Sequence, residues 1–241
     1  MDDFKTIRFA LIICLGCSLI LASAYSLLDP MYKTNKKNEL RELVLRASGE
    51  NIFADADKKI KKPIADIEAV FEKKISFVVL DSNGTLADQQ DVFKLSDTQQ
   101  FKETNGVKKY YPIFVYTADN GSKKYVTQMS GKGLWSTIKS LVAIEGDFET
   151  IAGFEVIGHG ETPGLGGEVE QDYFRDPFKG QKLYENGKQL YFEVTKGKAV
   201  GNHQVDGLSG ATMTCKGVTA FMNKDYAVYN RYFNSLRKGG M

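Results

Sequence analysis

The chain has 241 residues, of which 42% are hydrophobic and 26% charged, and its formal net charge is +2. These proportions are those of an ordinary globular protein, and a charge so close to neutral argues against a nucleic-acid-binding protein. Three cysteines are too few for a disulfide framework, and no cluster of cysteine and histidine has the spacing of a zinc or iron–sulfur site, so redox chemistry would need a borrowed cofactor.

The first predicted element is an apolar segment at residues 9–28. It has no charged residue over about 20 positions and would be about 30 Å long as a helix, which is enough to cross a bilayer. Two other interpretations are a cleaved signal peptide, with Ala22-Ser23-Ala24 as its small-residue exit, and a lipoprotein signal that uses Cys17. The apolar run is longer than the core of a signal peptide and continues well past Cys17, so a transmembrane anchor is the better prediction.

The charges that flank this segment leave its orientation open. Lys5 and Arg8 precede it, and Lys33, Lys36 and Lys37 follow it. Neither side has the clear excess of basic residues that the positive-inside rule requires.

Beyond the anchor, hydrophobic periodicity predicts one helix at 33–47, ending at Ser48-Gly49, and a second around 64–71. Runs of β-branched and aromatic residues predict strands at 75–80, 110–116, 123–129, 141–144, 151–157 and 190–194. Turns are predicted at 81–84, 119–121 and 145–147, and the last two join hairpins. A final helix is predicted over 216–237, where apolar residues recur at spacings of three and four: Val218, Phe221, Met222, Tyr226, Tyr229 and Phe233.

Together these elements predict an α+β fold, in which one N-terminal transmembrane helix precedes a single domain with a mostly antiparallel, twisted sheet flanked by helices. We divide the chain into an N-terminal segment at 1–8, the membrane helix at 9–28, a helical stalk or N-terminal subdomain at 29–72, and the main domain at 73–241.

Three stretches, at 130–136, 159–168 and 205–218, contain more glycine than packing requires. Each alone would be read as a surface turn, but three in one domain, with several hydroxyls and the only tryptophan, favour a ligand site. The last stretch precedes the final helix, where free N–H groups suit a phosphate. Its glycine spacing is not that of a Walker A loop, so the residues alone predict a phosphate-bearing ligand and leave its identity open.

The same stretches carry a family resemblance. The run Asp206-Gly207-Leu208-Ser209-Gly210-Ala211-Thr212 resembles the flavinylation motif of the FMN-binding domain family, in which FMN is joined by a phosphoester to the final threonine. The run from His159 to Gly166 and the run Gly133-Leu134-Trp135-Ser136 look like two further hallmarks of that family. Their order and the N-terminal helix resemble most the C subunits of sodium-translocating NADH:quinone oxidoreductases; the G subunits of Rnf ferredoxin:NAD complexes are the alternative.

The resemblance implies that FMN is attached covalently to Thr212 and that Asp206 serves recognition by the flavin transferase, together with Ser209, Gly210 and Ala211, which also line the cofactor. It places the phosphate near Thr214, Lys216 and Gly217. It places the flavin ring against Glu161, Thr162, Gly164 and Leu165, with Trp135 and Ser136 as a wall.

Other interpretations remain open for four of these side chains. Trp135 could instead pack in the core, Glu161 could cap a turn, and His159 could be a hydrogen-bonded loop residue rather than a proton donor. Position 215 is a cysteine where the family usually has a small hydroxyl residue, which puts a hydroxyl contact there in doubt.

The resemblance also implies a function. The chain would be an electron relay within a bacterial inner-membrane complex that oxidises NADH, reduces quinone and pumps sodium, and it would not be catalytic alone. Its partners would be the other subunits, the flavin transferase and the lipid bilayer. The main domain would lie in the periplasm and the N-terminus in the cytoplasm. No catalytic side chain, metal or nucleic acid is expected. A rival of another class is a membrane-anchored module that binds a phosphate ligand reversibly.

Overall fold

The computed structural model describes residues 2–55, 57–87 and 90–239, and it separates the chain after Leu40 into two units. Helix α1 (Asp2–Ala47) runs through both units, so the predicted apolar segment and the predicted helix at 33–47 form one helix. Pro30 lies inside this helix without ending it, and Thr34 Oγ1 donates to the Pro30 carbonyl at 3.0 Å. Among the described residues, α1 is the one helix that is long and apolar enough to cross a membrane.

The second unit, residues 41–241, is built on a five-stranded antiparallel sheet whose strands follow one another in chain order. The strands are β3 (Ile75–Asp81), β4 (Tyr110–Thr117), β5 (Lys123–Lys132), β6 (Thr137–Ile144) and β7 (Ile151–Gly158). This confirms the antiparallel α+β fold and the strands predicted over 75–157. Strand β6 begins four residues earlier than predicted, so the first glycine-rich stretch forms the β5–β6 hairpin loop at 133–136.

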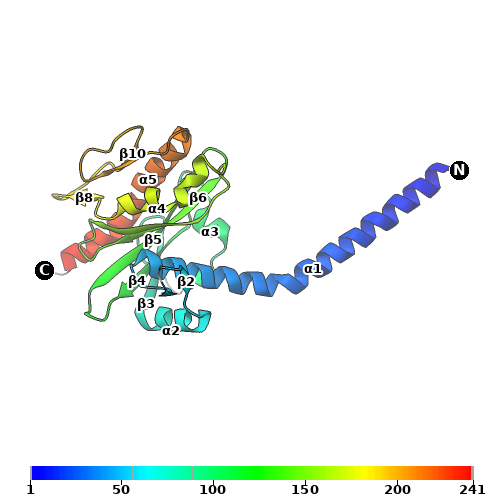
Figure 1. Ribbon diagram of the computed structural model, residues 1–241, viewed down its shortest axis with the longest axis horizontal. Coiled ribbons are helices and arrows are strands. Elements are labelled where there is room, and N and C mark those ends of the chain that lie inside the picture. The colour runs from blue at the N-terminus through cyan, green and yellow to red at the C-terminus, as the bar shows by residue number, and fades with distance from the viewer. Residues whose placement is uncertain (1, 56, 88–89, 240–241) are drawn as a thin grey trace. The chain divides into compact units, whose positions relative to one another are not determined.

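Helix α5 (Thr212–Gly239) packs against β5 on one face of the sheet (Figure 1). The predicted apolar stripe is confirmed, because all six of its residues are buried. Asp225, on the same helix, forms an ion pair with Lys108, and both side chains are fully buried. The helix begins at Thr212 and not at 216, so the prediction of its start was wrong by about one turn.

The other face of the sheet is covered by the end of α1 and by α2 (Ile64–Lys74). Phe71 of α2 makes an edge-on ring contact with Phe114 of β4, while Tyr111 of the same strand contacts Tyr229 of α5. Both faces of β4 are therefore buried, which explains why its sequence reads as a continuous apolar run. Residues from Arg41 onward, within the segment expected to be a stalk or subdomain, pack in this unit.

Short elements complete the unit. Before the sheet and between β3 and β4 lie β1 (Phe53–Asp55), β2 (Ile60–Lys61), η1 (Val92–Lys94) and α3 (Asp97–Phe101). After β7 come η2 (Gly166–Glu170), α4 (Asp172–Arg175), η3 (Asp176–Phe178), β8 (Tyr184–Glu185), β9 (Lys188–Gln189), β10 (Glu193–Thr195) and β11 (Gln204–Asp206).

The strand predicted at 190–194 is shifted in the structure to β10, which pairs in parallel with β11. Leu190 N–H donates to the Leu183 carbonyl, and Phe192 N–H donates to Asn223 Oδ1 of α5. Because these contacts already satisfy the backbone of the earlier residues, the ladder begins only at Glu193.

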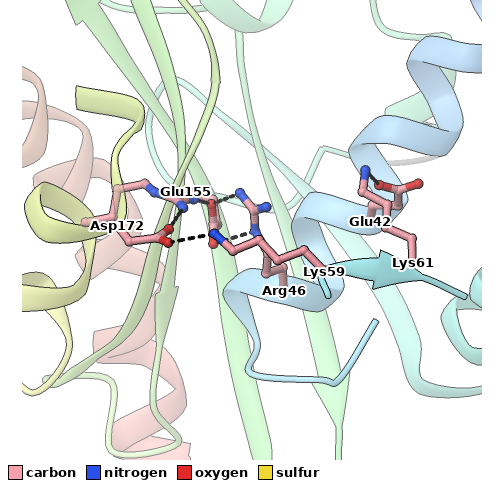
Figure 2. Close-up of polar contacts among 7 residues, drawn as sticks. Glu42, Arg46, Lys59, Lys61, Glu155 and Asp172 are labelled. Carbon is pink, nitrogen blue, oxygen red and sulfur yellow. Dashed lines mark hydrogen bonds and ion pairs between the residues drawn. The ribbon is translucent and has the colours of Figure 1, made fainter. Parts of the chain in front are cut away.

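A charged cluster joins the end of α1 to β7 and α4, and Figure 2 shows most of it. Glu155 of β7 lies between the guanidinium groups of Arg46 and Arg175, and Arg46 Nε donates to its carboxylate at 2.7 Å. Asp172 of α4 pairs with Arg175 and, at 3.5 Å, with Lys59. The cluster fixes the segment that follows β7, which carries the second glycine-rich stretch.

Candidate functional site

The first part of the site is the β5–β6 hairpin loop, 133–136. Gly133 N–H donates to the Ser136 carbonyl at 2.8 Å, which closes a tight turn. The turn leaves Leu134 half-exposed, and the side chain of Trp135 is 71% exposed. The core-packing interpretation of Trp135 is therefore wrong, and the side chain is free to contact a ligand.

The second part is the carboxylate of Glu161, which is only 5% exposed. It accepts hydrogen bonds from the backbone N–H groups of Leu134, Trp135 and Ser136 at 3.0–3.1 Å, and from the hydroxyl of Thr214 at 2.7 Å. Burial alone would raise the pKa of this carboxyl, but the hydrogen bonds from Thr214 and the three N–H groups lower it to about 2. The turn-capping interpretation of Glu161 describes these contacts, because the carboxylate binds the hairpin loop.

The rest of the second glycine-rich stretch forms a compact loop. His159 Nδ1 accepts from the N–H of Glu161 at 3.0 Å, and its Nε2 lies 2.7 Å from the Glu170 carboxylate, so His159 is a hydrogen-bonded loop residue. The carbonyl of Thr162 accepts from Leu165 N–H at 3.2 Å, which leaves the Leu165 side chain exposed.

The third part is the turn that leads into α5. Gly210 has a φ of +74°, in the left-handed region that glycine adopts at little cost. The carbonyl of Ala211 accepts the N–H of Cys215 at 3.0 Å and begins the helical pattern. Ser209 and Thr212 are exposed, so the Thr212 hydroxyl lies at the first turn of the helix and is accessible.

Three residues expected near a phosphate occupy different environments. Thr214 is buried, and its hydroxyl donates a hydrogen bond to Glu161. Gly217 lies against the Lys132 carbonyl in the interface with the hairpin, where a side chain would not fit. Lys216 is exposed, one helical turn after Thr212. Of the three, only Lys216 presents its side chain to solvent.

Cys215 and Asp206 hold the turn in place from two sides. The Sγ atom of Cys215 accepts from the N–H of Leu208 at 3.2 Å, and burial raises the pKa of this thiol. The Asp206 carboxylate accepts from Ala199 N–H at 2.7 Å and lies 3.2 Å from Lys198 Nζ; these two contacts lower its pKa. The thiol thus takes over a structural hydrogen bond at position 215.

Two features of this region were missed by sequence reasoning. Met213, between Thr212 and Thr214, is more than half exposed and adds a flexible apolar side chain to the surface beside the Thr212 hydroxyl. A cavity of about 420 Å³ lies between α4 and β11 and is bordered by Tyr173, Phe174 and Leu208. Neither follows from a local pattern, because both depend on which side chains the fold leaves uncovered.

Comparison with known proteins agrees with this geometry. A sequence model of the FMN-binding domain matches residues 133–226, the part of the chain that holds all three segments of the site. This segment thus resembles an FMN-binding domain in sequence.

Individual relatives identify the family of the chain more specifically. The chain is 31% identical to the C subunit of Na(+)-translocating NADH-quinone reductase from Pseudomonas aeruginosa, over 98% of this chain and 96% of that protein. It is 30% identical to the corresponding C subunit from Yersinia pestis, over 91% and 86%. The chain belongs to the family formed by the C subunits of Na(+)-translocating NADH-quinone reductases.

Solved structures agree with this assignment. The crystal structure of the C subunit from Parabacteroides distasonis is 28% identical, with a TM-score of 0.69 over 85% of this chain and 96% of that chain. NqrC of Shewanella oneidensis is 27% identical, with a TM-score of 0.73 over 85% and 99%. The expected resemblance to the C subunits is confirmed.

Proposed function

We propose that this chain is the electron-relay subunit of a membrane complex that oxidises NADH, reduces quinone and pumps sodium, and that it carries FMN in a phosphoester to Thr212. The observation that carries the proposal is the position of Thr212: its hydroxyl is exposed at the first turn of a 28-residue helix, within the residues matched by the FMN-binding domain. The names of the relatives supply the complex to which such a subunit would belong.

The start of α5 fits the phosphate end of FMN. The first N–H groups of a helix have no acceptor within it, and the helix dipole favours an anion there. Lys216, one turn further on and exposed, would add a positive charge. Thr214 and Gly217 would act through the packing of the helix, since neither presents a free side-chain donor.

Attachment would use FAD and a flavin transferase. The Thr212 Oγ1 atom would form a bond to the phosphorus of the FMN half, the phosphoanhydride bond of FAD would break, AMP would leave, and the hydroxyl proton would pass to a base on the transferase. The exposed residues Ser209 and Gly210 leave space for that enzyme. Ala211 and Asp206 would serve recognition by shaping the turn.

The exposed apolar side chains fit the ring end. Leu134, Trp135, Leu165 and Met213 come from all three segments of the site and would cover an isoalloxazine, with the turn of Thr162 at its polar edge. When bound, FMN supplies one-electron transfer. Because a phosphoester leaves the ring electronically free, these protein contacts would set its reduction potential.

The location follows from the same proposal. The apolar part of α1, residues 9–28, would anchor the chain in the inner membrane, with residues 1–8 in the cytoplasm and the main domain, predicted at 73–241, in the periplasm. The finding that one helix of the described residues is long and apolar enough to cross a bilayer supports the anchor.

The test is a denaturing gel viewed under ultraviolet light. Full-length protein co-expressed with the flavin transferase should give a fluorescent band at the 26.9-kDa chain, and Thr212→Val should abolish it. Thr219→Val is the control, because it removes a buried hydroxyl elsewhere on the same helix. Flavin that comes off on denaturation would favour the reversible phosphate-binding module. A band that persists in Thr212→Val would refute the choice of residue, and peptide mass spectrometry would then examine Ser209 and Thr214.

Co-purification tests the complex. Detergent-solubilised membranes should yield this chain together with the NADH-oxidising subunit. Recovery with a ferredoxin-dependent complex would contradict the assignment.

A further inference from the structure

The carboxylate of Glu161 joins three segments that are far apart in the chain. It binds the backbone of the hairpin loop at 134–136 through three N–H groups, and it binds helix α5 through the hydroxyl of Thr214. Thr214 lies two residues after Thr212, in the same first turn of the helix. One ionised group therefore connects the loop that carries Trp135 to the turn that carries the acceptor hydroxyl.

The orientation of Trp135 depends on this connection. Its indole is largely exposed, so packing against the core does not hold it. Its backbone N–H is bound by Glu161 Oε1 at 3.0 Å, and the N–H groups of Leu134 and Ser136, on either side, are bound by the same carboxylate. The contacts that fix the position of Trp135 are thus contacts of its backbone and of its two neighbours, and Glu161 accepts them.

The Glu161 carboxylate is tightly enclosed by its neighbours. A Cβ placed on Gly166 would lie 2.5 Å from the Thr214 hydroxyl and 2.9 Å from Glu161 Oε2. Ser136 completes the enclosure, since its hydroxyl lies 3.3 Å from Glu161 Oε1 and accepts the N–H of Gly160 at 2.6 Å. Water cannot easily replace a lost hydrogen bond in so tight a site.

We propose that Glu161 and Thr214 are positioning residues, which hold Trp135 at a fixed place relative to Thr212 and thereby set the environment of the flavin ring. The inference rests on the proposed function for its flavin part, whereas its loop part concerns this chain's own residues and can be measured without flavin. Glu161, by this proposal, acts on the cofactor through the hairpin loop rather than by contact with the ring.

The test without flavin uses the only tryptophan as its probe. Full-length protein made without the transferase is purified in detergent, and the fluorescence anisotropy decay of Trp135 is recorded. Thr214→Val should raise the amplitude of the fast, nanosecond component by roughly twofold, because the Glu161 carboxylate that binds the loop loses its hydrogen bond to α5. Thr214→Ser keeps a hydroxyl and should restore the wild-type decay.

Thr219→Val is the matched control. Thr219 is also a buried threonine of α5, and its hydroxyl also takes part in a hydrogen bond, accepting the N–H of Val194 at 2.9 Å. The Thr219→Val variant should lose stability to a similar extent and leave the anisotropy decay of Trp135 unchanged. Equal decays in Thr214→Val and wild type, or an equal change in Thr219→Val, would overturn the proposal.

The flavin-loaded protein gives the second readout. If Trp135 lies against the ring, it quenches flavin fluorescence, and Trp135→Phe should raise the emission. Thr214→Val should raise it toward the same level, while Thr219→Val should not. If no covalent flavin is found but the apoprotein decays follow the prediction, the proposed function fails and the loop inference stands. If flavin is attached but its emission in Thr214→Val equals that of wild type, the proposed effect of Glu161 and Thr214 on the ring environment is refuted, while the proposed function stands.

Discussion

Replacing Glu161 with glutamine should change how stability depends on pH, and the structure gives the size of the effect. The carboxyl has a pKa of about 2 in the folded protein against 4.5 as the ordinary value. A folded pKa below the unfolded one stabilises the protein above the unfolded pKa, and that contribution is lost as the pH falls toward the folded pKa. The shift corresponds to about 3 kcal/mol, of which about 2 kcal/mol is lost between pH 7 and 3.

Urea unfolding of the full-length chain in detergent, followed by far-UV circular dichroism, measures this contribution at several pH values between 3 and 7. The free energy of unfolding of wild type should exceed that of Glu161→Gln at pH 7, and the difference should shrink by about 2 kcal/mol by pH 3. Glu168→Gln is the control, because this carboxylate lies in the same stretch and accepts from the hydroxyl of Tyr173, whose side chain is exposed. Parallel pH profiles for wild type and Glu161→Gln would refute the reasoning, since they would mean that Glu161 is not held ionised by its hydrogen bonds.

Two further predictions concern ion pairs that hold the domain around the site. Asp225→Asn leaves the fully buried ammonium of Lys108 without its counter-charge and should cost about 3–5 kcal/mol in urea unfolding, whereas replacing both residues with apolar ones should recover most of the loss. Glu155→Gln removes the charge between Arg46 and Arg175 and should lower the free energy of unfolding by about 2–4 kcal/mol; a change below about 0.5 kcal/mol would show that the cluster does not hold the segment in place.

The strands of the sheet could be predicted because local signals agreed with the tertiary structure. The β4–β5 hairpin was marked by a turn at 119–121, and Gly121 indeed adopts a φ of +83° there. Its strands were marked by apolar and aromatic runs, which fit a sheet buried on both faces. Where a local signal was absent, as at the start of β6, the prediction began late, because the residues at 137–140 include lysine and two hydroxyls.

The start of α5 was predicted wrongly because tertiary packing overrides propensity. The helix was predicted from 216 because its apolar periodicity begins at Val218 and the glycine and hydroxyl residues before it look like a turn. In the structure Gly217 lets the helix approach the Lys132 carbonyl of the hairpin. The earlier start places Thr212 itself in the first turn, and the Thr214 hydroxyl, which was expected near the phosphate, faces Glu161.

The hydrogen bonds that Glu161 accepts could not be predicted from the sequence, because a carboxylate that binds backbone N–H groups needs no particular side chain opposite it. Sequence patterns name the three stretches but do not say that one side chain joins them. Local sequence does not report exposure either, so it left open whether Trp135, expected as a wall of the flavin site, packs in the core instead. An indole that is 71% exposed, on a turn whose backbone is fixed by an ionised and buried group, is a costly arrangement for a side chain without a partner. A flavin ring attached two residues from Thr214 would be that partner, so the exposure that contradicts a core role is itself an argument for the cofactor.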